Sequence, residues 1–277
     1  VIAPKSDEVA IGRSFAQAYL KKYLDGKVEP SRQHGSTEGM VATAAFLAMS
    51  DARSKQGLNS VTREGLDHAW SLLDDSGTWV DWLQCNWPPF ESDAEFGPTL
   101  MLVALGELAE LKQLERADQE GAKRLSAYLK ANPPLSLHAK AMRLWAAEDW
   151  PDLLRHKDEA AGWRKELLHA QAPDGGWSMA SLSGPAWKRD GGEAQTKTSE
   201  AYPTAFATYV LLRTAADPHE SDRTGSSPVN KGLLWLKSHQ RENGEWFTRS
   251  PRRDGKHYIS RAATAFALMA LAEGGQK

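Results

Sequence analysis

The amino-acid sequence predicts an all-α protein in which about five to six outer–inner helix pairs form an α/α toroid. Three observations support this prediction. Apolar residues follow a helical period along most of the chain, with Gly, Pro and Ser clusters between the helical segments. Apolar, Ala-rich helices alternate with more charged helices. A short motif ending in Trp recurs after the charged helices, and such a repeat indicates a repeat architecture.

The Ala-rich helices are expected to form the inner ring. Four of them share a Thr-led apolar segment, and a fifth has Lys in the Thr position: Thr43, Thr99, Lys140, Thr204 and Thr264. The helix at 260–272 is apolar nearly all round, so we expect neighbours on both sides of it.

A more charged helix precedes each inner helix and is expected to lie outside it. These outer helices span roughly 7–25, 62–74, 115–131, 156–171 and 228–240. Five pairs favour a closed toroid; the alternative is an open solenoid, which would need polar capping helices at its ends. Because no linker separates two cores, we predict a single domain over 1–277, with a mobile surface loop at 177–197.

The recurring motif ends the outer helices. It runs from Gln171 to Trp177 and from Gln240 to Trp246, and a variant with Asp for Gln runs from Asp74 to Trp79. Each copy carries Gly two residues before the Trp, where a positive φ ends a helix. Glutamine can donate to carbonyls at helix ends, and Trp can bury a large area. We therefore expect the motif to stabilise the fold.

The composition excludes several classes of function. A net charge of −2 over 277 residues gives no basic footprint for nucleic acid. The single cysteine, Cys85, excludes an internal disulfide, and no apolar run is long enough to span a bilayer. The chain begins at Val1 rather than Met, which is consistent with a removed leader. We expect a soluble protein, periplasmic or secreted in a bacterium, with the cytoplasm as the alternative.

The motif and the inner helices together resemble the squalene–hopene cyclase and protein prenyltransferase superfamily of α/α toroids. The segments ending in Trp177 and Trp246 resemble the QW motif of triterpene cyclases, and 260–271 resembles the last inner helix of hopene cyclases. The resemblance covers most of the chain and is sharpest from about 160 onward. It implies a toroid whose cavity binds or processes a hydrophobic isoprenoid, with an isomerase-type reaction if it is an enzyme.

The protonating motif of these cyclases is absent from this sequence. Their Asp-x-Asp-Asp motif crowds carboxyls at the start of an inner helix, so that one stays protonated and acts as a strong acid. At the matching places this chain has Glu95-Phe96-Gly97-Pro98 and Glu200-Ala201-Tyr202-Pro203. Each keeps a carboxylate only at the first position, and Ala262-Ala263 stands at the third place.

Polar residues near the inner-helix starts are the remaining site candidates, although capping explains carboxylates there as well. The full set is Glu38, Glu91, Asp93, Glu95, Ser199, Glu200, Tyr202 and Ser260. We predict Asp93, Glu95 and Glu200 as catalytic residues. Aromatic walls beside a carboxylate suit a carbocation or an isoprenoid chain. The predicted substrate-binding residues are Trp82, Trp87, Phe90, Glu91 and Tyr202.

We predict no cofactor and no metal. A zinc site would need Asp93, Cys85 and His138, whose spacing is not diagnostic, and no Cys precedes His34 as covalent haem would require. The basic run from Arg249 to His257 is interpreted as a solvated loop, with anion binding as the alternative.

Three hypotheses of function follow. The first is an isoprenoid-binding or terpene cyclase-like toroid without the usual acid motif. The second is a non-catalytic binding or scaffold module. The third is a saccharide-active toroid enzyme, for which Trp-rich, acid-lined clefts are suited. The sequence does not indicate an oligomeric state.

Overall fold

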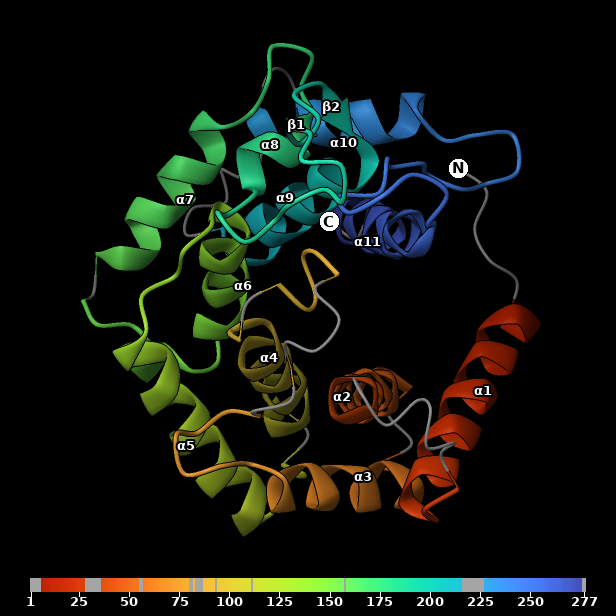
Figure 1. Ribbon diagram of the computed structural model, residues 1–277, viewed down its shortest axis with the longest axis vertical. Coiled ribbons are helices and arrows are strands. Elements are labelled where there is room, and N and C mark those ends of the chain that lie inside the picture. The colour runs from red at the N-terminus through yellow and green to blue at the C-terminus, as the bar shows by residue number, and fades with distance from the viewer. Residues whose placement is uncertain are drawn as a thin grey trace.

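The computed structural model describes residues 6–27, 36–54, 57–79, 82, 87–92, 94–110, 112–156, 158–215 and 227–275. Five outer–inner helix pairs form an α/α toroid (Figure 1), which confirms the predicted fold class. The inner helices are α2 (Ser36–Ser54), α4 (Phe96–Glu110), α6 (Leu137–Ala147), α9 (Ala201–Arg213) and α11 (Tyr258–Gly275). The outer helices are α1 (Ser6–Leu24), α3 (Ser60–Ser71), α5 (Arg116–Ala131), α7 (Glu159–His169) and α10 (Pro228–Ser238).

Three short elements lie in the connection between α7 and α9, and one lies before α7. Strands β1 (Trp177–Ser178) and β2 (Ser199–Glu200) pair antiparallel, and helix α8 (Met179–Leu182) follows β1. A 3₁₀ helix, η3 (Pro151–Leu153), precedes α7. The connection predicted as a mobile loop is packed rather than free-standing. Trp187 and Arg189 are buried, and the Gln195 side chain donates to the carbonyls of Trp187 and Pro251.

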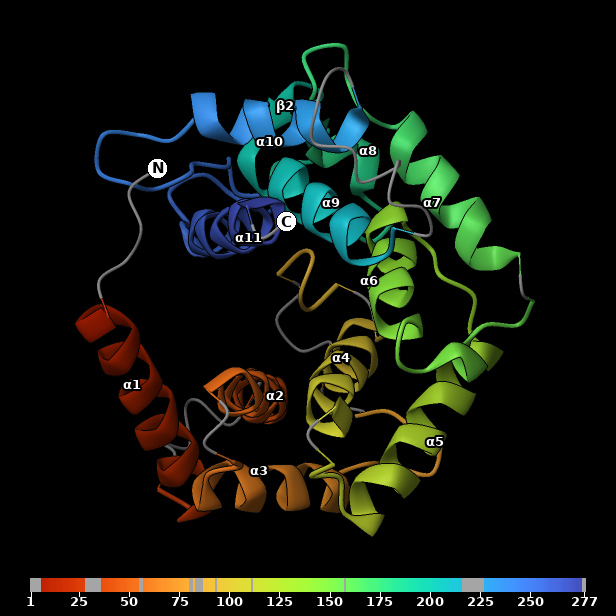
Figure 2. The ribbon, with the colours of Figure 1, turned by 180° about the vertical axis from the view of Figure 1, so that it is seen from behind.

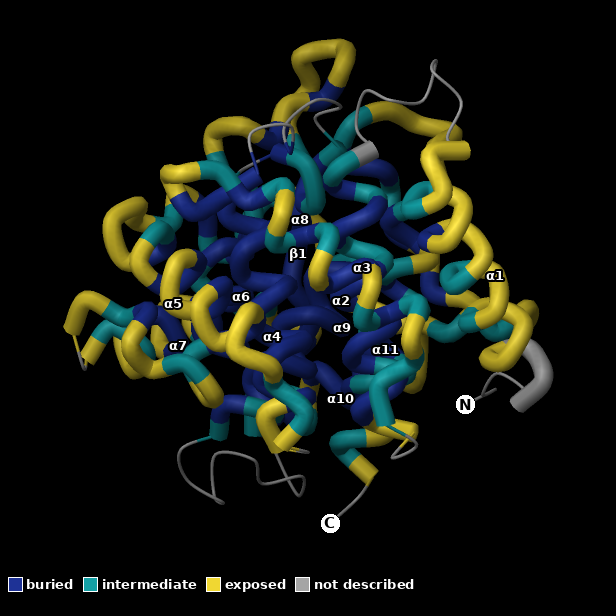
Figure 3. The backbone as a smooth tube through the Cα atoms, turned by 90° about the horizontal axis from the view of Figure 1, so that it is seen from below, coloured by how far each residue is buried: buried dark blue, intermediate teal, exposed yellow. Residues whose placement is uncertain are grey.

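The core lies in and against the inner helices, as Figure 3 shows by burial. Helix α4 is buried along nearly its whole length, as expected for a helix that is apolar all round. Its first turn needs Gly97 because a Cβ there would lie 2.7 Å from the Trp82 ring. Within the described residues, no helix combines the length and apolar character that crossing a membrane requires.

The recurring Trp motif ties three of the five outer helices, α3, α7 and α10, to the structure around them. The indole N–H groups of Trp79, Trp177 and Trp246 donate to the carbonyls of Ala69, Leu167 and Leu236, always ten residues earlier, at 2.8–3.0 Å. These carbonyls lie near the ends of α3, α7 and α10, where intrahelical partners run out. The motif therefore caps these three outer helices, and the donor is the Trp indole rather than the glutamine that the sequence suggested.

The same motif anchors the next inner helix. The backbone N–H of Trp177 donates to Thr204 Oγ1 of α9, and that of Trp246 to Thr264 Oγ1 of α11. Gln171 Nε2 donates to the Gly175 carbonyl and, at 2.8 Å, to the Pro228 carbonyl at the start of α10. The shared spacing of the Trp177 and Trp246 segments thus corresponds to one structural unit that occurs twice.

The ring is open between its first and last pairs, as Figures 1 and 2 show. Among the described residues, α11 makes no extensive contact with α1 or α2. In keeping with this, much of α11 is only partly buried, and the apolar Phe15 and Phe46 on α1 and α2 are exposed. The sequence predicted a closed ring, and the structure corrects this, because five pairs leave one sector unfilled.

Candidate functional site: a central cavity

A cavity of about 1160 Å³ lies at the middle of the ring and reaches the open sector. Its volume is above the usual range for sites that bind small molecules. All five inner helices except α9 contribute to it, together with α1. The lining residues include Arg13, Gln17, Phe46, Met49, Arg53, Asn59, Phe90, Phe96, Leu100, Met142, Trp145, Ala265, Phe266 and Met269.

One side of the central cavity is apolar and largely aromatic. Helices α4, α6 and α11 supply side chains without charge there: Phe96, Leu100, Met142, Trp145, Phe266 and Met269. Trp145 packs edge-on against Phe266, with ring centroids 6.2 Å apart, and against Tyr209 of α9. Because aromatic neighbours fix these rings, this wall is preformed.

The other side comes from α1, α2 and the residue before α3, and it combines the apolar Val9, Ala10, Phe46 and Met49 with all the polar residues of the lining. Its polar residues are Arg13, Ser14, Gln17, Ser50, Arg53, Ser54 and Asn59. Arg13 forms an ion pair with Asp51, which is fully buried and also accepts from Thr62 Oγ1 at 2.8 Å. Arg53 Nη2 lies 2.6 Å from Glu107 Oε1. The two acids do not line the cavity, so both charged side chains in its wall are cations.

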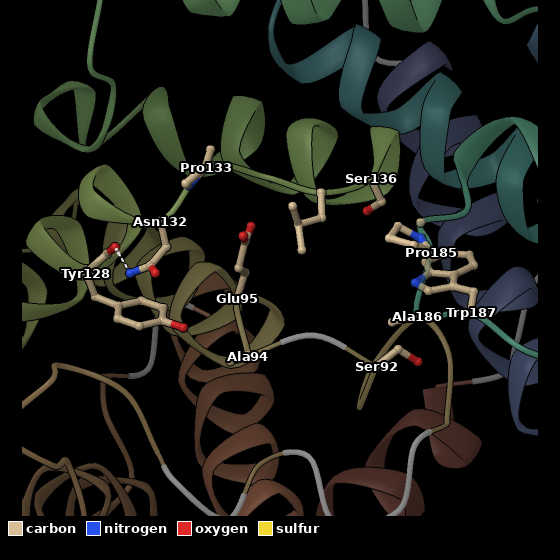
Figure 4. Close-up of a pocket in the computed structure, with 12 residues that line it drawn as sticks. Ser92, Ala94, Glu95, Tyr128, Asn132, Pro133, Ser136, Pro185, Ala186 and Trp187 are labelled. Atoms are coloured by element: carbon tan, nitrogen blue, oxygen red, sulfur yellow. Dashed lines mark hydrogen bonds between the residues drawn. The ribbon is translucent and has the colours of Figure 1, made fainter.

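Glu95 lies outside the central cavity, in a separate pocket of about 400 Å³ beside α5 and α6. Figure 4 shows its carboxylate between Asn132 on one side and Ser136 on the other. Glu95 Oε2 is 2.9 Å from Arg143 Nη2, and both side chains are buried. Arg143 also donates to the Leu129 carbonyl at the end of α5, so Glu95 balances a buried charge that caps this helix.

Glu200 lies at the start of α9 in a further pocket, of about 330 Å³, near α10. Its Oε1 accepts from the backbone N–H of Arg249 at 2.9 Å. Burial raises the pKa of Glu200, despite that hydrogen bond. Asp174 lines the same pocket. Burial opposes its ionisation, but hydrogen bonds from the Gly176 N–H, Ser199 and Trp235 lower the pKa of Asp174.

The predicted aromatic residues divide between the core and the surface. Trp82 is buried, and its indole N–H donates to the Phe90 carbonyl, so it packs on α4 rather than lining the central cavity. Trp87 and Glu91 line a surface pocket of about 380 Å³ beside Tyr258. Phe90 lines both that pocket and the central cavity.

Tyr202 is fully buried and forms a hydrogen bond with His138 Nε2 at 2.8 Å. The His138 ring stacks on Phe206, 4.4 Å between centroids, and burial lowers the pKa of His138 to about 3. Burial also raises the pKa of Tyr202 well above its usual range. The pair is therefore neutral at ordinary pH. The two residues are far apart in sequence, and no motif signals their contact.

The predicted site residues therefore do not converge on one pocket. Phe90 is the member of the set that reaches the central cavity, and Asp93 lies outside the described residues. Sequence reasoning missed most of the cavity wall, including Arg13, Arg53, Trp145 and Phe266. Aromatic and Met residues at helical spacing in the inner helices are a weak signal for such a wall, since a filled core has the same pattern.

Ion pairs with nearby carboxylates account for two arginines of the basic run. In the basic run, Arg249 forms ion pairs with Asp254 and Glu193, and Arg252 with Asp190. These pairs satisfy the two arginines within the surface connections around α8 and before α11.

Across the part of the chain that the structure describes, no group of three or more His, Cys, Asp or Glu side chains is arranged to hold a metal ion.

Comparison with known proteins supports the fold. No protein-family model matches the chain, and no curated protein matches it in sequence. Among solved structures, a polysaccharide lyase is similar with a TM-score of 0.51 and 14% identity, over 84% of this chain and 71% of the lyase chain. A protein from Actinoplanes is similar with a TM-score of 0.38 and 14% identity, over 95% of this chain and 100% of that protein. At this identity the lyase likeness speaks for a shared α/α architecture.

Proposed function

We propose that this protein binds an elongated apolar ligand, such as an isoprenoid or acyl chain, in the central cavity. The observation that carries the proposal is the preformed wall of Phe96, Trp145 and Phe266 around a space of about 1160 Å³ that opens to the surface. Burying apolar ligand area against such a wall contributes roughly 25 cal/mol per Å². A hydrated sugar would leave its hydroxyl groups without partners on this side.

The proposal is for binding, with no cyclisation step. The protonating Asp residues are replaced at each matching helix start, and Glu95 is engaged with Arg143 outside the cavity. Membership of the squalene cyclase-like superfamily stays part of the proposal, supported by the capping geometry of the Trp motif.

The test is mass spectrometry of apolar molecules that remain bound through purification. Ala265 is exposed in the cavity wall, so Ala265→Trp fills the space without displacing the core. Ala272 is exposed on the same helix outside the wall, and Ala272→Trp is the matched control. We expect a retained apolar species in the unmodified protein and in Ala272→Trp, and its loss in Ala265→Trp. Retention in Ala265→Trp would exclude the cavity as the binding site.

A second candidate is a saccharide-active enzyme, and the fold likeness to a polysaccharide lyase favours it over a terpene cyclase. Two carboxyls with opposite pKa shifts, Glu200 raised and Asp174 lowered, line one pocket with Trp235. Glycoside cleavage uses one protonated and one ionised carboxyl in this way. However, Asp174 is already engaged by Gly176, Ser199 and Trp235, which also explains its low pKa.

Activity on a panel of neutral and acidic polysaccharides tests the second candidate. Release of new reducing ends, lost in Glu200→Gln and kept in the control Glu245→Gln, would establish it. Glu245 is an exposed carboxylate that does not line the Glu200 pocket. No release from any member of the panel would remove this candidate and leave the apolar-ligand proposal unaffected.

A further inference from the structure

The central cavity has two chemically different sides, and this asymmetry bears on the kind of ligand it takes. Helices α4, α6 and α11 contribute only apolar lining residues, whereas all the polar lining residues come from α1, α2 and Asn59, beside the apolar Val9, Ala10, Phe46 and Met49. A purely apolar chain would leave the polar side without partners. A ligand with one polar end would match both sides at once.

The charged groups of the polar side are both cationic. Arg13 and Arg53 line the cavity, whereas their partners Asp51 and Glu107 do not. Asp51 is held in place by the Asn59 backbone N–H and the Thr62 hydroxyl, so Arg13 is fixed from behind. In both ion pairs the arginine is thus the member that a ligand would meet.

The donors of Arg13 are incompletely used. Its Nη2 donates to Asp51, while its Nε is buried and has no hydrogen-bond partner among the described residues. The Arg13 side chain is nevertheless 26% exposed and lines the cavity, so an anionic oxygen there could accept a charge-assisted hydrogen bond from the accessible part of the guanidinium. Gln17 and Asn59, in the same wall, are further possible donors.

We propose that the ligand is a carboxylate amphiphile: an apolar chain against α4, α6 and α11, with its carboxylate toward Arg13 and Arg53. The inference rests on the proposed function and adds the headgroup to it. Each arginine is already paired with one carboxylate, so the wall offers N–H donors rather than net positive charge, and Asp51 and Glu107 repel a dianion more strongly than a monoanion. A headgroup of single negative charge is therefore favoured over a phosphate ester.

Displacement of a neutral fluorescent probe, N-phenylnaphthylamine, measures this preference. Dodecanoate, dodecanol, dodecyl phosphate and dodecyltrimethylammonium share one chain and differ in headgroup. We expect dodecanoate to displace the probe about 10- to 100-fold more tightly than dodecanol, the range of one or two charge-assisted hydrogen bonds. Added salt should reduce the difference.

Two variants locate the headgroup. Arg13→Met with Asp51→Asn removes both charges of one pair, and Arg53→Met removes the other cation. Arg155→Met is the matched control, because Arg155 is similarly exposed, at 42% against 43% for Arg53, and pairs with Glu159 on the surface. We expect both cavity variants to reduce the preference for dodecanoate over dodecanol, and the control to keep that preference.

The outcomes are distinguishable. Equal displacement by dodecanoate and dodecanol, tighter binding of dodecyl phosphate, or a preference that survives in both cavity variants would overturn the carboxylate inference while apolar binding stands. If no amphiphile displaces the probe and the probe itself does not bind, the proposed function fails, and this inference fails with it.

Discussion

At the scale of single residues, buried polar groups in this ring are explained by partners that the sequence places far away. Glu95 and Arg143 are 9% and 1% exposed as side chains and lie 2.9 Å apart. Removing one member of a buried ion pair leaves the other charge without compensation, which costs about 3–5 kcal/mol. Glu95 therefore stabilises the contact between α5 and α6 by pairing with Arg143, which donates to the Leu129 carbonyl.

We predict that Glu95→Gln lowers the free energy of unfolding by about 3 kcal/mol in urea denaturation. The double variant Glu95→Gln with Arg143→Met should be less destabilised than the sum of the two single variants, since it leaves no buried charge unpaired and loses only the hydrogen bonds from Arg143 to the Leu129 and Asn132 carbonyls. A double variant as unstable as the sum of the two single variants would show that the pair is not coupled.

His138 gives a prediction on pH. Its pKa is lowered by burial from 6.5 to about 3, so below pH 6.5 the unfolded chain binds a proton that the folded protein excludes. Stability is therefore lost as the pH falls from 6.5 towards 3, with a slope of up to about 1.4 kcal/mol per pH unit from this group.

Replacing both members of the pair, His138→Phe with Tyr202→Phe, should flatten this part of the stability–pH curve without leaving a buried polar atom unpaired. Urea midpoints measured at several pH values between 4.5 and 7 on both proteins provide the comparison. An unchanged slope in the double variant would mean that His138 is not the group that titrates.

At the scale of elements, the Trp motif is a capping unit for the outer helices. We predict that Trp177→Phe destabilises the fold by about 2 kcal/mol, because the buried Leu167 carbonyl loses its indole donor, and that Trp246→Phe costs less, because the Leu236 carbonyl keeps the His239 N–H as a donor at 3.2 Å. Amphiphile binding should be unchanged, since neither Trp lines the central cavity. A loss of binding at unchanged stability would assign the motif to the ligand site instead.

The elements were largely predictable from the sequence, and the site was not. Helical periodicity predicted all five pairs, and the Gly-x-Trp endings marked the ends of three outer helices, since both are local signals. The position of Trp82 and the His138–Tyr202 pair depend on packing between distant segments, which local patterns do not carry. In the sequence, Arg13 looks like an ordinary charged residue on the surface of a helix. Only the arrangement of the helices shows that it lines the central cavity.

At the scale of the whole molecule, five pairs leave a ring with an open sector and an apolar cavity that reaches it. We predict that Ala265→Trp weakens the binding of apolar chains at least tenfold, about 1.4 kcal/mol, because the indole occupies the cavity. Ala272→Trp should bind as the unmodified protein does. Equal affinity in both variants would place binding outside the ring.

The most direct measurement of the central claim is quenching of Trp145 fluorescence by a brominated alkyl chain. Trp145 lines the central cavity, and the other tryptophans in the described residues do not. We predict that the bound chain quenches part of the tryptophan emission, and that Trp145→Phe removes most of the quenchable part. Quenching of equal size in Trp145→Phe would show that the chain binds elsewhere and would contradict the account.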